Sequence, residues 1–221
     1  MAKKYDSQGT INEILSHAAN LFLEKGFSNT SMNDIATAAG ISKGAIYHHF
    51  KSKEEIVEAV TTQQEVTIRE IMERWLLEAE TLNGKEKLQF ILEKNIDSQE
   101  VHCLDDVMSA RMKSAEFVLR YMKDSVHNGA PFIAEIIKKG IEDGSLTTDF
   151  PDEIAETFLL LLNVWCDPAV FNGTIEKLDA RLKFLQTMMI KMGVDVLSDV
   201  LIKKTVNLLQ KLYFEGEQRN E

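Results

Sequence analysis

Apolar residues recur every three or four positions along almost the whole chain, and this spacing predicts a succession of amphipathic helices. Thr10 and Glu13 have the spacing of a capping box at the start of the first helix. Gly26 is expected to end this helix in a left-handed conformation, with Phe27 folded back onto Phe22. The apolar stripe of the helix consists of Ile11, Ile14, Leu15, Ala18 and Phe22.

Two shorter helices are predicted within residues 31–53, and their pattern is that of a helix-turn-helix. Gly40 supplies a left-handed corner between them, and Ala36 is small enough for a close helix contact. Ser42 is placed to cap the second helix, whose Ile46 points back toward the first. The small core between the two helices also contains Ile35, Ile41 and Phe50.

The second helix of this pair has an outward face without carboxylates, of a kind that can enter a DNA major groove. The residues on this face are Lys43, Ala45, Tyr47, His48 and His49. In its first turn, after the Ser42 cap, the free backbone N–H groups at Lys43 and Gly44 favour a phosphate. The sequence therefore predicts a DNA-binding surface centred on this helix.

A longer helix is expected from residue 53 to about residue 81, opened by a capping box of Ser52 and Glu55. Lys53, at the positively polarised start of this helix, is a second candidate phosphate contact. Beyond Gly84, helices are predicted near 85–98, 103–113, 115–127, 131–142, 152–166, 174–192 and 195–214. Around Pro131 the pattern favours a helix stop and restart over a kink within one long helix.

The block around the helix-turn-helix resembles the DNA-binding segment of the TetR family of bacterial transcriptional regulators. The resemblance is carried by Thr30-Ser31, Asp34-Ile35-Ala36, the run from Ala39 to Gly44, the run from Ile46 to Phe50, and the run from Ser52 to Glu55. It covers roughly the first quarter of the chain. It implies an all-α protein with an N-terminal three-helix DNA-binding domain at 1–53 and a larger helical domain for effector binding and dimerisation at 54–221.

The resemblance also assigns roles to particular residues. It implies that a hydroxyl at Thr30 or Ser31 contacts a phosphate, although capping of the first helix of the pair would explain either residue by itself. It implies that the helix 53–81 links the DNA-binding domain to the rest of the chain. It implies nothing about the identity of the effector, because the remainder of such proteins diverges widely.

The net charge of −10 is distributed unevenly along the chain. Residues 1–53 hold six lysines, two of them Lys3 and Lys4, against four carboxylates, a charge of +2 that leaves −12 for the rest. A mildly basic head on an acidic body would orient the protein on DNA and keep the body away from the phosphates. Ordinary surface variation is the alternative explanation of this division.

Sequence motifs point away from several other classes of protein. Cys103 and Cys166 are far apart and lack CxxC spacing, so neither a zinc ribbon nor a disulfide framework is indicated, and a reducing cytoplasm fits. The chain shows no signal-peptide core, no apolar run of membrane-spanning length and no catalytic or phosphate-cradling motif. His102, Cys103, Asp105 and Asp106 are close in sequence, but neighbouring side chains point to different helix faces, which argues against a metal site.

Several predicted helices of the middle region contribute methionine and aromatic residues, which suit an adaptable pocket for a small apolar or aromatic effector. These residues are Met72, Trp75, Phe90, Met108, Met112, Phe117, Tyr121 and Met122. A well-filled core would use the same residue types, so both interpretations stay open. Arg111, Arg120 and His127 are weaker candidates for contact with an anionic group of the effector.

The helices 152–166 and 174–192 are candidates for a homodimer interface. The first is apolar on all sides and must be buried on two faces, and the second has an apolar seam at alternating four- and three-residue spacing. The predicted interface residues are Phe158, Leu162, Trp165, Leu178, Leu182, Leu185 and Met189. Phe184, Met188 and Ile190 are expected to face their own subunit. Packing of the seam against the last helix, 195–214, is the competing explanation.

Together these patterns predict a cytoplasmic, non-enzymatic transcription regulator without a cofactor or metal. We expect a repressor that binds a palindromic operator as a homodimer and leaves it when an effector binds. A helical ligand-binding or sequestering protein without operator specificity is the alternative from another class.

Overall fold

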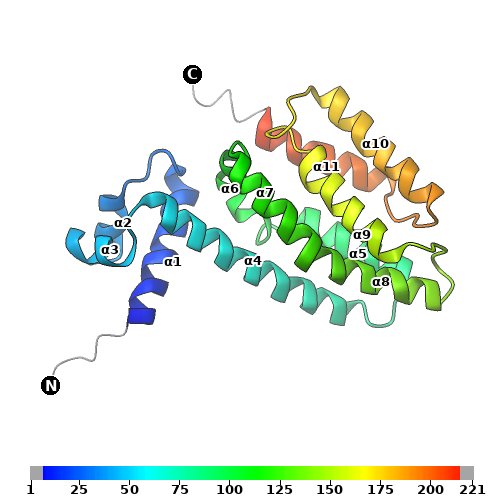
Figure 1. The fold of residues 1–221 in the computed structure, drawn as a ribbon, viewed down its shortest axis with the longest axis horizontal. Helices are drawn as coiled ribbons and strands as arrows, with labels where there is room; N and C mark the ends of the chain where they lie inside the picture. The colour runs from blue at the N-terminus through cyan, green and yellow to red at the C-terminus, as the bar shows by residue number, and fades with distance from the viewer. Residues whose placement is uncertain (1–6, 215–221) are drawn as a thin grey trace. The chain divides into compact units, whose positions relative to one another are not determined.

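The computed structural model describes residues 7–214, and between these limits the chain is all-α with no strand (Figure 1). The helices of the N-terminal half are α1 (Ser7–Lys25), α2 (Met32–Ala38), α3 (Lys43–His49), α4 (Lys53–Glu78) and α5 (Gly84–Asp97). They are followed by α6 (Asp105–Arg111), α7 (Ala115–Asp124), α8 (Ala130–Glu142), α9 (Pro151–Leu160), α10 (Ile175–Lys191) and α11 (Asp199–Tyr213). None of the helices in this part of the chain is long and apolar enough to cross a membrane.

Two compact units make up the chain, and each contains residues from separate stretches of sequence. Within the described residues, the first unit comprises 7–71 and 100–108, and the second comprises 72–99 and 109–214. The predicted domain boundary after residue 53 falls at the start of α4, whereas the two units divide within α4 and within α6. Where independent folding domains begin and end therefore stays a prediction.

The core of the first unit explains why it includes residues from far along the chain. The 3₁₀-helix His102–Leu104 and the start of α6 bring Leu104 and Val107 into the same buried cluster as the helix-turn-helix. From α1 to α4, this cluster contains Ile14, Leu15, Ala18, Phe22, Ile35, Ala36, Ile46, Phe50, Ile56, Val57 and Val60. We will call these first-unit residues, 7–71 with 100–108, the DNA-binding unit, after the DNA-binding surface that the sequence predicts on the helix-turn-helix.

The predicted end of the first helix is confirmed, and its predicted start is wrong. Gly26 has φ +78°, and the ring centroids of Phe22 and Phe27 lie 5.5 Å apart. The chain is already helical at Ser7, so Thr10 lies inside α1 and does not cap it. Thr10 and Glu13 can both stand inside a helix, so the spacing of a capping box does not by itself mark the first residue of a helix. Lys3 and Lys4 of the predicted basic head lie outside the described residues.

The predicted break before Pro131 is wrong, because α7 and α8 form one continuous helical segment (Figure 1). A π-helical stretch, Ser125–Gly129, joins them, and Gly129 and Ala130 both have right-handed helical dihedrals. Proline cannot donate the interior hydrogen bond of an α-helix and its ring crowds the preceding turn. A wider π-turn placed directly before Pro131 changes the hydrogen-bonding register at this position, so the segment continues without a break.

The second unit packs its remaining helices around α8, which contacts α5 and α9. Near one end of this unit the backbone of α5 lies directly on that of α8, since a Cβ atom on Gly84 would be 2.2 Å from the Gly140 nitrogen. The Gly84 N–H donates to Oδ2 of Asp143 at 2.7 Å.

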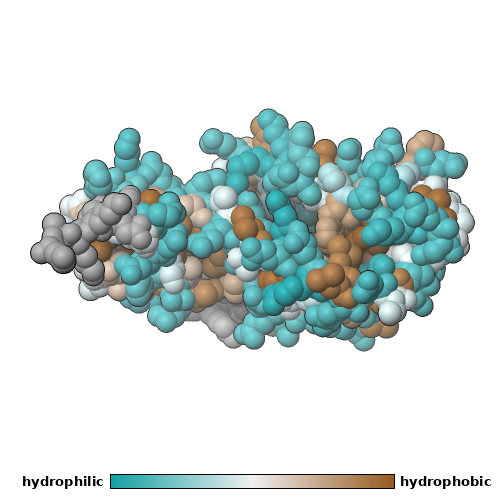
Figure 2. Space-filling model, turned by 90° about the horizontal axis from the view of Figure 1, so that it is seen from below, coloured by the Kyte–Doolittle hydropathy of each residue, from teal (hydrophilic) through white to brown (hydrophobic). Residues whose placement is uncertain are grey.

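On the face shown in Figure 2, hydrophilic residues predominate and apolar residues form small groups, as expected when the apolar stripes of helices face inward.

Candidate functional sites

The first helix of the helix-turn-helix begins at Ser31, which caps it. The Ser31 hydroxyl oxygen accepts from the Asp34 N–H at 3.2 Å, and the Asp34 carboxylate accepts from the Ser31 N–H at 2.9 Å. The hydrogen bond from the Ser31 hydroxyl, followed by that from its backbone, lowers the pKa of Asp34. This reciprocal pair fixes the start of α2.

A left-handed glycine joins α2 to α3, as the sequence predicts. Gly40 has φ +65°, and the Ser42 hydroxyl oxygen caps α3 by accepting from the Ala45 N–H at 3.1 Å. Ile46 of α3 is fully buried in the core of the DNA-binding unit. A Cβ atom on Gly40 would meet no heavy atom within 4 Å, so the constraint at this corner is the backbone angle rather than space.

Replacing Gly40 with valine is therefore expected to disorder the α2–α3 pair. An L-residue in the left-handed region costs about 1–2 kcal/mol, and a β-branched side chain costs more. The variant should lose the amide NMR dispersion of residues 31–50 and its DNA binding, while the second unit stays folded. Gly44→Ala is the control for folding, because Gly44 has no left-handed backbone and its added Cβ would meet only the Ser42 hydroxyl at 3.9 Å. A Gly40→Val protein with native dispersion and full operator affinity would refute this assignment of the corner.

The structure places most of the predicted DNA contacts on the accessible side of α3. Lys43, Gly44, Tyr47 and His48 are exposed, and Ala45 and His49 are partly buried. The rings of His48 and His49 are neighbours, with centroids 5.4 Å apart. The exposed part of this helix thus offers an ammonium, a phenol and an imidazole without a carboxylate.

Two of the predicted phosphate contacts are engaged within the protein. Thr30 is buried, and its hydroxyl donates to the carbonyl oxygens of Gly26 at 2.9 Å and Leu21 at 3.3 Å. The Lys53 ammonium donates to the Phe27 carbonyl oxygen at 2.6 Å. Of the two hydroxyls considered at the start of α2, only that of Ser31 is exposed. Thr30 therefore has no accessible hydroxyl for a DNA phosphate in this conformation.

The candidate effector residues do not all belong to the same unit. Met108 lies in the DNA-binding unit, and the other seven lie in the second unit. In the second unit Trp75, Met112 and Phe117 are buried, whereas Met72, Phe90, Tyr121 and Met122 are partly exposed.

One group of these side chains, at the junction of α6 and α7, combines aromatic rings with cations. The Phe117 and Tyr121 rings are stacked with centroids 6.0 Å apart. The guanidinium carbons of Arg111 and Arg120 lie 4.1 and 5.0 Å from the Phe117 ring centroid. The structure therefore brings two of the three predicted cations to one aromatic ring, whereas His127 is exposed and bonded to the Lys123 carbonyl oxygen.

The predicted dimer seam of α10 faces the interior of its own chain. Leu178, Leu182, Leu185 and Met189 are buried, and Leu178 and Leu182 belong to a cluster with Cys166 and Ile202 of α11. The seam thus meets the last helix, which was the competing explanation. Phe158 is also fully buried within the chain, and Leu162 and Trp165 are partly buried against the same cluster. Heptad spacing identifies an apolar face but does not identify the helix that covers it.

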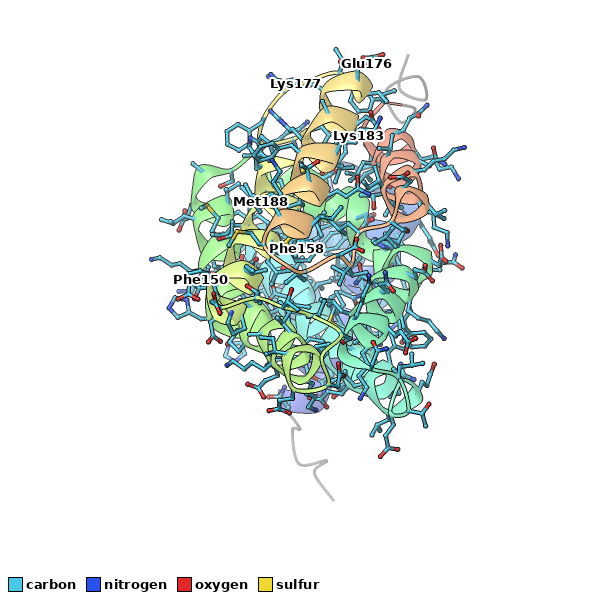
Figure 3. All side chains as sticks on the ribbon, turned by 90° about the vertical axis from the view of Figure 1, so that its right-hand side faces the viewer. Phe150, Phe158, Glu176, Lys177, Lys183 and Met188 are labelled. Atoms are coloured by element: carbon cyan, nitrogen blue, oxygen red, sulfur yellow. The ribbon has the colours of Figure 1, made fainter. Side chains whose placement is uncertain are left out.

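Other apolar residues of α10 lie outside this seam, and one of them, Met188, is labelled in Figure 3 together with the charged Glu176, Lys177 and Lys183 of the same helix. Phe184 and Ile190 are exposed and Met188 is partly buried, so their own chain covers these three residues only in part. Phe184 packs edge-on against Trp165 with centroids 5.8 Å apart. Arg181, which the sequence did not single out, donates to the carbonyl oxygens of Trp165 at 2.8 Å and Phe171 at 3.3 Å. The Arg181 guanidinium carbon also lies 5.3 and 5.7 Å from the ring centroids of Trp165 and Phe171, and we will call Phe171 and Phe184 the outer face.

The cysteine and histidine residues form no metal centre among residues 7–214. Nδ1 of His102 lies 2.8 Å from Oδ2 of Asp105, an ordinary pair within the DNA-binding unit. Burial raises the pKa of the Cys103 thiol and raises that of Cys166 to about 12. Both thiols therefore stay protonated at neutral pH, which makes them poor nucleophiles and poor metal ligands.

Sequence comparison finds the strongest similarity over the helix-turn-helix. A family model described as bacterial regulatory proteins of the tetR family matches residues 14–60. The HTH-type transcriptional repressor KstR2 of Mycobacterium tuberculosis is 28% identical over 156 residues, which are 66% of this chain and 74% of that protein. The HTH-type transcriptional regulator AcrR of Shigella flexneri is 41% identical over 68 residues, 31% of this chain and 32% of AcrR.

Structural comparison extends the similarity of fold to nearly the whole chain. A transcriptional regulator from Cytophaga hutchinsonii matches with a TM-score of 0.60 at 18% identity, covering 92% of this chain and 94% of that one. A transcriptional regulator from Saccharomonospora viridis, crystallised in complex with choline, matches with a TM-score of 0.55 at 20% identity, covering 92% of this chain and 96% of that one. At these identities the likeness concerns the arrangement of the helices.

Proposed function

Because this chain belongs to the TetR family of bacterial regulators, we propose that it is a cytoplasmic repressor that binds a palindromic operator as a homodimer. A small apolar or aromatic effector would release it from that operator. The chain is a DNA-binding regulator and not an enzyme, in keeping with the names of its relatives.

The observation that carries this proposal is the accessible side of α3, held in place by the Gly40 corner and the Ser42 cap. In our proposal α3 enters the major groove, where Ala45, His48 and His49 face base edges. Ser31, Ser42, Lys43, Gly44 and Tyr47 contact the flanking phosphates. Such phosphate contacts set affinity for all DNA, and the base-facing side chains set the preferred sequence.

Exposed aromatic residues support a homodimer through the outer face. Phe184, near the middle of α10, is more than half exposed in the single chain, and Phe171 is exposed in the α9–α10 connection. Exposed aromatic side chains of this kind are typical anchors of a protein interface. A partner helix that covers α10 from outside would bury them, while the predicted seam residues stay inside each chain.

Continuous helices support regulation by an effector. Helix α4 contains residues of both units, and so does α6, whose last residue is Arg111 of the Arg111, Phe117 and Arg120 group. An effector that binds more tightly to one conformation of these helices in the second unit would raise the population of that conformation in the DNA-binding unit as well. The shift in free energy equals the difference between the effector's binding free energies for the two conformations. The two arginines and the aromatic rings suit an aromatic effector with an anionic group. The relative crystallised with choline binds a small molecule on the same fold.

Selection and sequencing of DNA bound by the purified protein would test the proposal. The expected result is an inverted repeat whose half-sites are separated by about one or two helical turns, since two identical heads must face the same side of the duplex. Enrichment of a single unrepeated half-site would contradict the homodimer. Absence of any enriched sequence would instead favour a ligand-binding protein without operator specificity.

Substitutions on α3 are expected to separate affinity from sequence preference. Tyr47→Phe, which removes one hydroxyl donor, should weaken binding to the operator and to random DNA by a similar factor. His48→Ala should change which bases are preferred at one position in each half-site, with a discrimination of about 1–3 kcal/mol at that position. Repeating the selection with each variant measures both effects. Identical base preferences in His48→Ala and the wild type would exclude His48 from direct readout.

A further inference from the structure

The turn that connects α1 to α2 is held in one conformation by its own hydrogen bonds. Gly26 is left-handed, the Thr30 N–H donates to the Phe27 carbonyl oxygen at 3.3 Å, and the Asn29 amide donates to the Lys25 carbonyl oxygen at 3.0 Å. The buried Thr30 hydroxyl completes this set through its bonds to Leu21 and Gly26. Because Ser31 follows directly and caps α2, the position of this turn decides where α2 begins.

Lys53 connects this turn to another helix of the same unit. Lys53 is the first residue of α4, and its ammonium donates to the Phe27 carbonyl oxygen at 2.6 Å. The same nitrogen lies 4.2 Å from the centroid of the Phe27 ring, which packs against Phe22 in the core. A charge-assisted hydrogen bond and a cation–π contact thus meet at one side chain.

We propose that Lys53 is a positioning residue of the DNA-binding unit, which fastens the Gly26–Thr30 turn to the first turn of α4. Both ends of the helix-turn-helix are then fixed, since α2 follows the turn and α3 precedes α4. The proposal rests on the proposed operator binding, because its consequence is the orientation of α3 in the major groove. It differs from the phosphate contact that the position of Lys53 at a helix start suggests.

The two roles of Lys53 predict different behaviour in the absence of DNA. A phosphate ligand has no effect on the free protein, whereas a positioning residue keeps the Thr30 N–H on the Phe27 carbonyl. The two roles also differ in their dependence on salt. Loss of one phosphate contact makes the plot of log affinity against log salt concentration shallower by about 0.9. Loss of a positioning contact lowers operator affinity and leaves that slope unchanged.

The test uses the full chain with Lys53→Met, Lys53→Arg and Lys51→Met. Methionine keeps much of the apolar stem and removes the donors and the charge. Arginine keeps a cation that can donate to the carbonyl and lie over the ring. Lys51→Met is the matched control, because this exposed lysine is two residues away and its removal changes the net charge equally. Amide hydrogen exchange of the DNA-free proteins and operator and random-DNA affinities at several salt concentrations are measured for all three and the wild type.

In Lys53→Met we expect exchange of the Thr30 amide to rise by about tenfold or more, since hydrogen bonds to charged groups are among the stronger ones. Operator affinity should fall more than random-DNA affinity, with an unchanged salt slope. Lys53→Arg should restore most of the protection of the Thr30 amide and most of the operator affinity. Lys51→Met should leave Thr30 exchange at the wild-type rate. Unfolding of the DNA-binding unit in Lys53→Met but not in Lys51→Met would also support an intramolecular role.

Wild-type exchange at Thr30 in Lys53→Met, together with a shallower salt slope, would overturn the proposal and assign Lys53 to a phosphate. Failure of the proposed function is recognised separately, because the wild-type protein would then show no operator preference. The exchange measurement still decides the intramolecular contact in that case.

Discussion

Phe184→Glu is expected to convert the protein to monomers and to remove its preference for a symmetric operator. In the homodimer proposed above, this position is covered by a partner, so the carboxylate would be buried without a counter-charge in both copies. A cost of about 3 kcal/mol or more weakens the dimer more than a hundredfold. In the separated chain the side chain is 57% exposed, so the fold of the second unit should be unaffected. Sedimentation velocity at micromolar concentration measures the change.

Leu119→Glu provides the control, since Leu119 is 55% exposed and lies on α7. This variant makes the same change of charge at a similarly exposed apolar position of the second unit, and it should remain dimeric. Monomeric Phe184→Glu should retain only the weak binding that a single head makes to any DNA, with a Kd on the order of 10⁻⁴–10⁻⁶ M. If Phe184→Glu stays dimeric with full operator affinity, the interface lies on another face of the chain.

Leu104→Ala is expected to abolish DNA binding although residue 104 is far in sequence from the helix-turn-helix. Leu104 is buried in the core of the DNA-binding unit, together with Val107 and the helices α1 to α4. Replacing a buried leucine by alanine costs about 2–5 kcal/mol, which is a large fraction of the stability of a small unit. Amide exchange should accelerate throughout residues 14–60 of the DNA-free variant, and operator affinity should fall in parallel.

Leu77→Ala is the matched control for that change, because Leu77 of α4 is 74% exposed and its truncation should cost less than about 0.5 kcal/mol. Its exchange rates and DNA affinity should resemble those of the wild type. If Leu104→Ala kept wild-type protection of α1 to α3, residues 100–108 would not stabilise the DNA-binding unit.

The features that the sequence predicted well depend on residues close together in the chain. The left-handed glycines at 26 and 40, the cap at Ser42 and the contact of Phe22 with Phe27 are all confirmed. Of the two candidate caps of α2, Thr30 and Ser31, the structure has Ser31. Each is decided by the backbone preference of one residue or by a contact within a few positions. The accessible side of α3 follows from these features, because the buried Ile46 determines which positions point outward.

The features that the sequence did not predict depend on contacts between distant segments. The spacing of Leu178, Leu182, Leu185 and Met189 shows that one side of α10 is apolar, but α11 and a second subunit are equally suitable covers. The packing of residues 100–108 with α1 leaves no local pattern. The hydrogen bond from Lys53 to a main-chain oxygen leaves none either, since any residue could stand at position 27 and supply that oxygen.

At Pro131 the prediction was wrong for a local reason. Proline usually ends a helix because it lacks an N–H donor, but the π-turn before Pro131 changes the hydrogen-bonding register and the helix continues.

The inclusion of residues 100–108 in the DNA-binding unit also limits how this protein can be recombined with its relatives. A chimera that exchanges only residues 1–53 would place a new α1 against the old Leu104 and Val107, whose shapes were matched to the replaced core. Exchange of residues 1–71 together with 100–108 would transfer that core as a set. The core of the DNA-binding unit is thus formed by two separate segments of the chain, and an engineered chimera needs crossovers around both segments to keep that core intact.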